Sequence, residues 1–258
     1  MKPARRDDWL VLAGRFGIVI AFAAAWEVLG RIGKSDPELL PPLSKVLVTL
    51  WQLLHDPDFL VDLRITMVEI AVAFVIVAPL GLLIGFVVGE NRRLYHVVNP
   101  TIQLMMATPK AIFLPIFIIA FGIGFAEKVL FSTMIGLFAV ILSGIAAVHS
   151  VPQGLTTAAR SFGVNKRQLY LQIYLPAMTP LIIGGLRLGL VFTIFGVLLS
   201  EMYAAPNGVG HSFVAWGESY RMPELMAGVL LIVAITVALD EMMRLAEEHY
   251  GKWRKSAR

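Results

Sequence analysis

The stretch 156-TTAARSFGVNKRQLYLQIYLP-176 joins two long apolar runs and is itself polar. It carries three bases and no acid, the bases being Arg160, Lys166 and Arg167. Gly163 can adopt the left-handed backbone conformation that ends a helix, and Asn165 can cap the helix that follows. Residues 152–172 are therefore predicted to form a helix, a turn and a second helix.

The end of this stretch leads into the next apolar run. A residue that precedes proline is disfavoured in the helical region, so Leu175 is expected to be extended. Pro176 suits the first turn of a helix, where its missing N–H costs no hydrogen bond.

The composition identifies a membrane protein. Of the 258 residues, 57% are hydrophobic and only 16% are charged, which lies well outside the range of soluble domains. The chain has no cysteine, and this excludes disulfides, thiolate metal sites and a cysteine nucleophile. The net charge of +4 is explained better by membrane topology than by nucleic acid binding.

Six apolar segments are long enough to cross a bilayer, which takes about 20 residues of helix. An unpaired backbone group in hydrocarbon costs several kcal/mol, so these segments are expected to be helices. Residues 1–258 are predicted to form one all-α transmembrane domain. The six predicted spans are 11–30, 66–89, 97–121, 127–148, 177–200 and 225–245.

Basic residues gather in alternate links between these spans. Both terminal tails and the links near residues 90 and 160 are basic, whereas the links 31–65 and 201–224 hold more acids than bases. Cytoplasmic links carry an excess of lysine and arginine. Both termini and the 152–172 segment are therefore predicted to be cytoplasmic.

Two spans carry glycines at a spacing of four residues. Gly81, Gly85 and Gly89 form one row, and Gly185 with Gly189 forms another. Such rows let two helix backbones approach closely. They indicate packing between spans of the same chain, with a dimer interface as the alternative.

Two prolines fall inside the third predicted span. Pro109 and Pro115 remove backbone hydrogen bonds, so this helix is expected to bend or unwind. Lys110 lies between them, and a charge at membrane depth usually faces a cavity or a partner. Lys110 is a candidate contact for an anionic substrate; the alternatives are that it extends to the membrane surface or pairs with Glu69.

Two further charges lie in or beside the fifth span. Arg187 is expected to pair with an acid across the helix bundle. Glu201 precedes 204-AAPNGVG-210, a sequence typical of turns, and this region is a candidate for an outer gate.

The spacing of the opening stretch resembles a known motif. Ala158-Ala159, then Gly163, then Ile173-x-Leu175-Pro176 match the EAA loop of permease subunits of ATP-binding-cassette importers. Thr157 stands where that loop has glutamate, which removes the glutamate's ion pair, although a threonine can cap the short helix. Without this spacing, the bases alone would indicate nothing more than a cytoplasmic loop.

The resemblance extends over most of the chain. The segments 109–124, 173–190 and 200–213 are similar to the nitrate, sulfonate and taurine branch of these permeases. The resemblance implies the type I importer permease fold, with the 152–172 segment coupled to an ATPase. The coupling residues that it implies are Thr157, Ala158, Ala159, Arg160, Gly163, Lys166 and Arg167.

Partners also follow from the resemblance alone. It implies a second permease copy in a homodimer, two cytoplasmic ATPase subunits that bind ATP and Mg²⁺, and a periplasmic or lipoprotein substrate-binding protein. The chain would be a multi-pass protein of the bacterial inner membrane. Its expected cargo is a small organic solute, anionic or heteroaromatic.

Motifs for catalysis are missing from the sequence. It contains no GxxxxGK[ST] phosphate loop, no HExxH and no GxSxG, and its five histidines lack the spacing of metal ligands. We therefore expect no enzyme activity and no cofactor or metal in this chain. The alternative function is an ion-coupled secondary transporter, but no inverted repeat and no clustered membrane carboxylates are evident.

Overall fold

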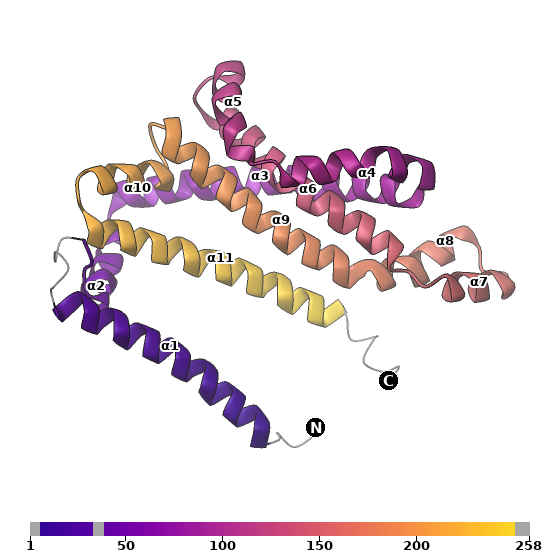
Figure 1. Cartoon of the computed structure of the whole chain (residues 1–258), viewed down its shortest axis with the longest axis horizontal. Helices are drawn as coiled ribbons and strands as arrows, with labels where there is room; N and C mark the ends of the chain where they lie inside the picture. Colours follow the sequence, from indigo (N-terminus) through magenta and orange to yellow (C-terminus); the bar gives the residue numbers. More distant parts are fainter. Residues whose placement is uncertain (1–5, 33–38, 251–258) are drawn as a thin grey trace. The chain divides into compact units, whose positions relative to one another are not determined.

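The computed structural model describes residues 6–32 and 39–250, and within them the chain is helical without a strand (Figure 1). The longer helices are α1 (Arg6–Ile32), α3 (Pro57–Glu90), α6 (Phe125–His149), α9 (Leu175–Ala204) and α11 (Met222–Tyr250). The shorter ones are α2 (Leu43–Leu53), α4 (Arg92–Ala107), η1 (Lys110–Phe113), α5 (Leu114–Phe121), α7 (Gln153–Ser161), α8 (Lys166–Leu169), η2 (Tyr170–Tyr174) and α10 (Val209–Glu218).

The described residues fall into two compact units. The first comprises the residues up to Leu60 together with Ser212–Ile232, and the second comprises Val61–His211 together with the residues from Val233 onward. Each unit is described by itself below.

Polar contacts and aromatic packing hold the first unit together. Trp26 Nε1 donates to the carbonyl of Pro41 at 3.1 Å, and Glu27 accepts from the backbone N–H of Ser44 at 2.9 Å. These bonds fix the end of α1 beside the start of α2. Gly228 leaves room for the ring of Phe213, which a Cβ there would approach to 2.6 Å.

Helix α6 forms the centre of the second unit and packs along α9 in the opposite direction. Small residues allow this approach at successive turns. A Cβ at Gly185 would lie 2.1 Å from the Cβ of Ser143, and one at Gly196 would lie 2.7 Å from the Cα of Ser132. The predicted glycine row of the fifth span therefore packs against α6.

The glycine row of α3 faces α6 as well. A Cβ at Gly85 would lie 2.7 Å from the carbonyl oxygen of Ile141 and 2.9 Å from the Cα of Gly144. Gly81 and Gly89 meet residues of the same α6 face one turn to either side. Both rows pack within the chain, as the sequence predicted.

The number of spans is confirmed only in part. Among the described residues, four helices are long and apolar enough to cross a membrane: Pro57–Glu90, Phe125–His149, Arg167–Tyr203 and Met222–Leu245. A fifth candidate is the pair Arg92–Ala107 and Lys110–Phe121, which is bent by 89°. The first predicted span falls within α1, and six crossings with cytoplasmic termini remain a prediction; both chain ends lie outside the described residues.

The predicted break in the third span is confirmed. Helix α4 ends before Thr108, which has an extended backbone, and the 3-10 turn η1 follows Pro109. Pro115 then lies in the first turn of α5, where its missing N–H is tolerated. The two prolines turn one apolar segment into two helices.

The expectation for Leu175 was wrong. Leu175 is helical, with φ −59° and ψ −47°, and the chain stays helical from α8 through η2 into α9. The π-helical turn η2 lies directly ahead of Pro176. A wider turn can absorb the hydrogen bond that proline cannot make, so the helix need not end there.

Candidate functional site

The segment between α6 and α9 folds as a helix, a turn and a helix. Gly163, at φ 74°, ends α7, and the backbone N–H of Val164 donates to the carbonyl of Ala159 at 3.2 Å. Asn165 Oδ1 then accepts from the N–H of Gln168 at 2.8 Å, and Gln168 Oε1 accepts from the N–H of Asn165 at 3.2 Å. This reciprocal capping starts α8 as the sequence predicted.

Much of this segment is open to contact. The side chain of Phe162 is 87% exposed beside Gly163, and a Cβ at Gly163 would meet nothing within 4 Å. Thr157, Ala158 and Arg167 are exposed, whereas Ala159 is buried. The side chains of Arg160 and Lys166 lie outside the part of the chain whose side chains are described.

Thr157 does not cap α7. The helix begins at Gln153, which places Thr157 at its fifth residue, and the carbonyl of Thr157 accepts from Ser161 Oγ at 3.1 Å. The expectation of a threonine cap is therefore wrong, because the helix starts one turn earlier than a cap at this position requires.

Lys110 lies at the bend between α4 and α5. Its Nζ donates to the carbonyl of Met106 at 3.1 Å and lies 5.7 Å from the centre of the Phe138 ring. The ammonium therefore neutralises the C-terminal end of α4, where carbonyls lack partners. It does not pair with Glu69, which rules out one of the sequence-based alternatives.

Arg187 pairs across the bundle, as expected. Its Nε and Nη2 donate to the two carboxylate oxygens of Asp240 at 2.7 and 2.6 Å. This two-point ion pair joins α9 to the part of α11 in the same unit, and both side chains are about one-third exposed.

A buried polar network lies at the opposite end of the second unit from α7 and α8. Lys128 Nζ and Glu69 Oε1 form an ion pair at 2.8 Å, and both side chains are 2% exposed. Next to this pair, Ser200 Oγ lies 2.7 Å from Oε2 of the buried Glu127 and donates to it. The network thus connects α3, α6 and α9.

Glu201 fastens the loop after α9 to this network. One carboxylate oxygen accepts from Thr66 Oγ1 at 2.7 Å, and the other accepts from the N–H of Gly210 at 2.8 Å. Thr66 accepts in turn from the N–H of Val209, and Asp62 accepts from the N–H of Gly208. Each of these backbone donors therefore meets a side chain of α3 or α9.

The sequence-based view that the spans carry no clustered carboxylates is wrong. Glu69, Glu127 and Glu201 come from three helices and are all buried near Lys128. All four residues stand within one turn of a predicted span end, where charges are normally solvated. Nothing in the sequence therefore indicated that they meet, although Glu201 was a candidate for an outer gate. Pairing Glu69 with Lys128, which are 59 residues apart, requires the packing of α3 on α6.

The fold and this site together define a polytopic α-helical membrane protein with an exposed helix–turn–helix at one end and a buried polar network at the other. Residues 78–249 match the model of the family described as binding-protein-dependent transport system inner membrane component. The match covers more than half of the chain, including α7 and α8. The chain belongs to this family and is therefore a multi-pass inner-membrane component of a transport system.

Curated relatives agree with this assignment. The putative aliphatic sulfonates transport permease protein SsuC of Bacillus subtilis (strain 168) is 27% identical over 256 residues, which is 99% of this chain and 92% of the relative. The taurine transport system permease protein TauC of Escherichia coli (strain K12) is 26% identical, covering 92% of this chain and 88% of the relative. The predicted branch of the permeases is confirmed.

A solved structure shares the fold. A chain of the MetNI methionine ABC transporter in an inward-facing conformation superposes with a TM-score of 0.54 at 20% identity. The alignment covers 87% of this chain and all of the other. The helical arrangement is thus shared with a chain of that ABC transporter.

Proposed function

We propose that this chain is the membrane permease of an ATP-driven importer for a small organic anion of the sulfonate or taurine class. The observation that carries the proposal is the family match over α7 and α8, combined with the exposure of that segment. The names of the relatives SsuC and TauC support the substrate class. A substrate-binding protein would deliver the solute on the side of the membrane away from α7.

ATP would act through a partner. In this proposal two permease copies form a homodimer, and two ATPase subunits bind ATP and Mg²⁺ and dock against residues 152–172. Thr157, Ala158 and Arg167 offer exposed contacts, Ala159 and Gly163 shape the turn, and the backbone carries the bases Arg160 and Lys166 into the same segment.

A displacement of residues 152–172 can be transmitted across the membrane because the helix that leaves this region is continuous. The apolar helical run Arg167–Tyr203 has 37 residues, or about 55 Å at helical rise. A displacement of α8 therefore moves the far end of α9, where Glu201 holds the loop 204–210. A ligand or nucleotide shifts the equilibrium between two such positions only by binding one of them more tightly.

The pathway residues are assigned on charge. We propose that Lys110 contacts the anionic solute, since it is a partly buried cation at a break in a span. Glu201 with the loop 204–210 forms the outer gate in this scheme. Arg187, held by Asp240, keeps α9 and α11 in register during the transition.

Replacing Gly163 with valine tests the coupling role. A β-branched residue resists the φ of 74° at this position, so the turn between α7 and α8 should be displaced. We expect membrane insertion at the normal level, with solute-driven ATPase activity and uptake reduced at least about tenfold, in proteoliposomes that contain the permease, its ATPase and its binding protein.

Gly154→Ala is the matched control, because Gly154 lies in α7, the helix that Gly163 ends, with nothing within 4 Å of an added Cβ. It should leave both activities unchanged. Full activity of the Gly163→Val protein would remove the coupling role from this turn. Ion-driven uptake by the purified permease alone would instead favour the secondary transporter.

Replacing Lys110 with methionine tests the pathway assignment. Methionine keeps the length of the side chain and removes the charge, so uptake of a sulfonate should require a higher solute concentration or should fall in rate. Lys110→Arg should retain most uptake, and Lys45→Met, at an exposed lysine of α2, should retain all of it. Unchanged kinetics of Lys110→Met would leave Lys110 with the helix-end role alone.

A further inference from the structure

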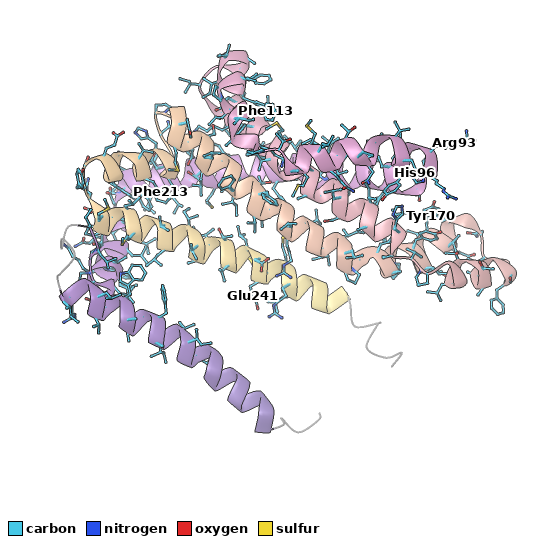
Figure 2. All side chains as sticks on the ribbon, viewed as in Figure 1. Arg93, His96, Phe113, Tyr170, Phe213 and Glu241 are labelled. Atoms are coloured by element: carbon cyan, nitrogen blue, oxygen red, sulfur yellow. The ribbon has the colours of Figure 1, made fainter. Side chains whose placement is uncertain are left out.

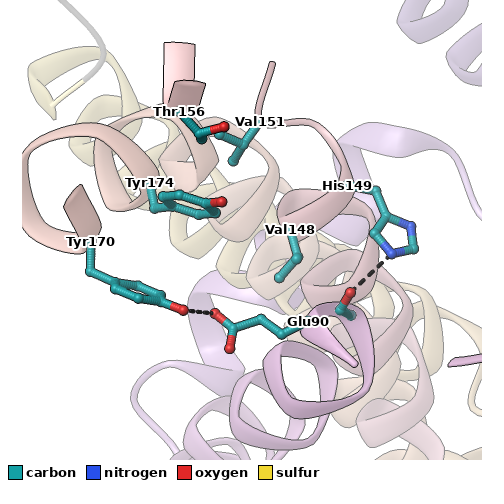
Figure 3. Close-up of a pocket in the computed structure, with 8 residues that line it drawn as sticks. Glu90, Val148, His149, Val151, Thr156, Tyr170 and Tyr174 are labelled. Carbon is teal, nitrogen blue, oxygen red and sulfur yellow. Dashed lines mark hydrogen bonds between the residues drawn. The ribbon is translucent and has the colours of Figure 1, made fainter. Parts of the chain in front are cut away.

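A pocket of about 460 Å³ lies where α3 and α6 end and residues 152–172, here called the coupling segment, begin (Figure 3). It stands at the other end of α6 from Lys128, about 30 Å away by helical rise. Figure 2 shows Arg93, His96 and Tyr170 toward this same end of the second unit. Residues of α3, α6, α7 and η2 form the walls, so the pocket belongs to neither the network nor the bend at Lys110.

Helix η2 contributes two aromatic faces to the pocket, and the end of α3 contributes the carboxylate of Glu90. Tyr170 and Tyr174 stack with ring centres 5.2 Å apart and planes inclined by 28°. The hydroxyl of Tyr170 donates to Oε1 of Glu90 at 2.6 Å, which aims the carboxylate along the pocket wall. The π-helical geometry of η2 places both tyrosines here, and such turns are frequent at functional sites.

The imidazole ring of His149 also lines the pocket. His149 Nε2 lies 3.1 Å from the carbonyl oxygen of Gly89. A carbonyl only accepts, so Nε2 is the donor in this contact. Among the described side chains, no lysine or arginine lines this pocket, and Glu90 forms no ion pair.

Carboxylate and ring faces select for positive charge. A guanidinium group matches a carboxylate at two points and stacks on an aromatic ring, and an alkylammonium group is attracted by the same ring faces. The volume exceeds that of one such group, so it admits a small molecule or the end of a long side chain.

We propose that this pocket binds a guanidinium or alkylammonium group between Glu90 and the rings of Tyr170 and Tyr174. Because its walls include α7 and η2, an occupied pocket would tie the coupling segment to the ends of α3 and α6. The cation can come from a free small amine or from a basic side chain of the ATPase. Both sources present the same chemistry to the pocket.

Calorimetric titration of the purified full-length permease with agmatine, a small alkylguanidine, tests the binding. We expect saturable binding that Glu90→Gln weakens at least about tenfold. Tyr174→Leu should weaken it as well, because it removes one ring face. Glu218→Gln, at an exposed glutamate elsewhere, is the matched control and should leave the affinity unchanged. N-Butylurea, a neutral analogue, should not bind.

Competition between agmatine and the ATPase subunit distinguishes the two sources of the cation. If it competes with agmatine, the physiological cation is one of its side chains; if agmatine binds equally well to the permease–ATPase complex, the cation is a free amine. The proposal is overturned if agmatine fails to bind the permease, or if it binds the unmodified and Glu90→Gln proteins equally. Neither result depends on whether the chain transports a sulfonate.

Discussion

A chain in which Lys128 is replaced by methionine is expected to lose about 3–5 kcal/mol of folding free energy. The substitution removes the cation that is hydrogen-bonded to Glu69, whose side chain is 2% exposed, and leaves a buried carboxylate without a compensating charge. The network also contains the buried Glu127 and Glu201, which Lys128 helps to offset. Denaturant unfolding of the purified protein in detergent micelles measures the loss.

Two further variants show whether charge or packing causes the effect. The double variant Glu69→Gln/Lys128→Met removes both members of the ion pair and should recover a large part of the stability, because no uncompensated charge is then left at position 69. Lys45→Met, at an exposed site, should change stability by less than about 0.5 kcal/mol. If the double variant is as unstable as Lys128→Met alone, the loss comes from packing rather than from the buried charge.

The features that sequence predicted correctly depend on short-range chemistry. Gly163 and Asn165 define a turn because a left-handed residue and an N-cap act on neighbouring backbone groups. The bend at Pro109 follows from a missing N–H in the same way. The prediction from the glycine rows is also correct, since a helix face without side chains has few uses other than close packing.

The features that could not be predicted from the sequence depend on contacts between residues that are far apart in the chain. Glu127 and Lys128 begin a predicted span, where charged residues are ordinarily solvated, and only the approach of α3 and α9 buries them. Leu175 was placed outside a helix by the rule for residues before proline. The rule did not hold here, because a π-helical turn that starts five residues earlier keeps Leu175 in a helical conformation.

The network and the coupling segment occupy opposite ends of the same three helices. Helix α9 continues from η2 at one end to Glu201 at the other, and α6 packs along it through Gly185, Gly189 and Gly196. A rigid core between the two ends is a condition for the proposed transmission, because a soft interface would absorb a displacement of α8. At the α3–α6 contact this core has little room to adjust, because backbone meets backbone there.

Replacing Gly85 with valine is therefore expected to cost at least about 3 kcal/mol, at or above the upper end of the range for overpacked cores. A Cβ at this position lies 2.7 Å from the carbonyl oxygen of Ile141 and 2.9 Å from the Cα of Gly144. Both neighbours are backbone atoms of α6, which cannot rotate away as a side chain can. We expect the helices to separate, with a loss of folded protein in size-exclusion chromatography and a lower unfolding midpoint.

Gly184→Ala provides the matched control, since Gly184 lies within α9 and an added Cβ there meets nothing within 4 Å. Alanine also restricts the unfolded chain, so this variant should be neutral or gain about 0.4–1 kcal/mol. The comparison isolates steric conflict from the general effect of replacing a helical glycine. If Gly85→Val folds with the stability of the unmodified protein, α3 and α6 are not in the close contact described, and the burial of Glu69 beside Lys128 would have to be reconsidered with it.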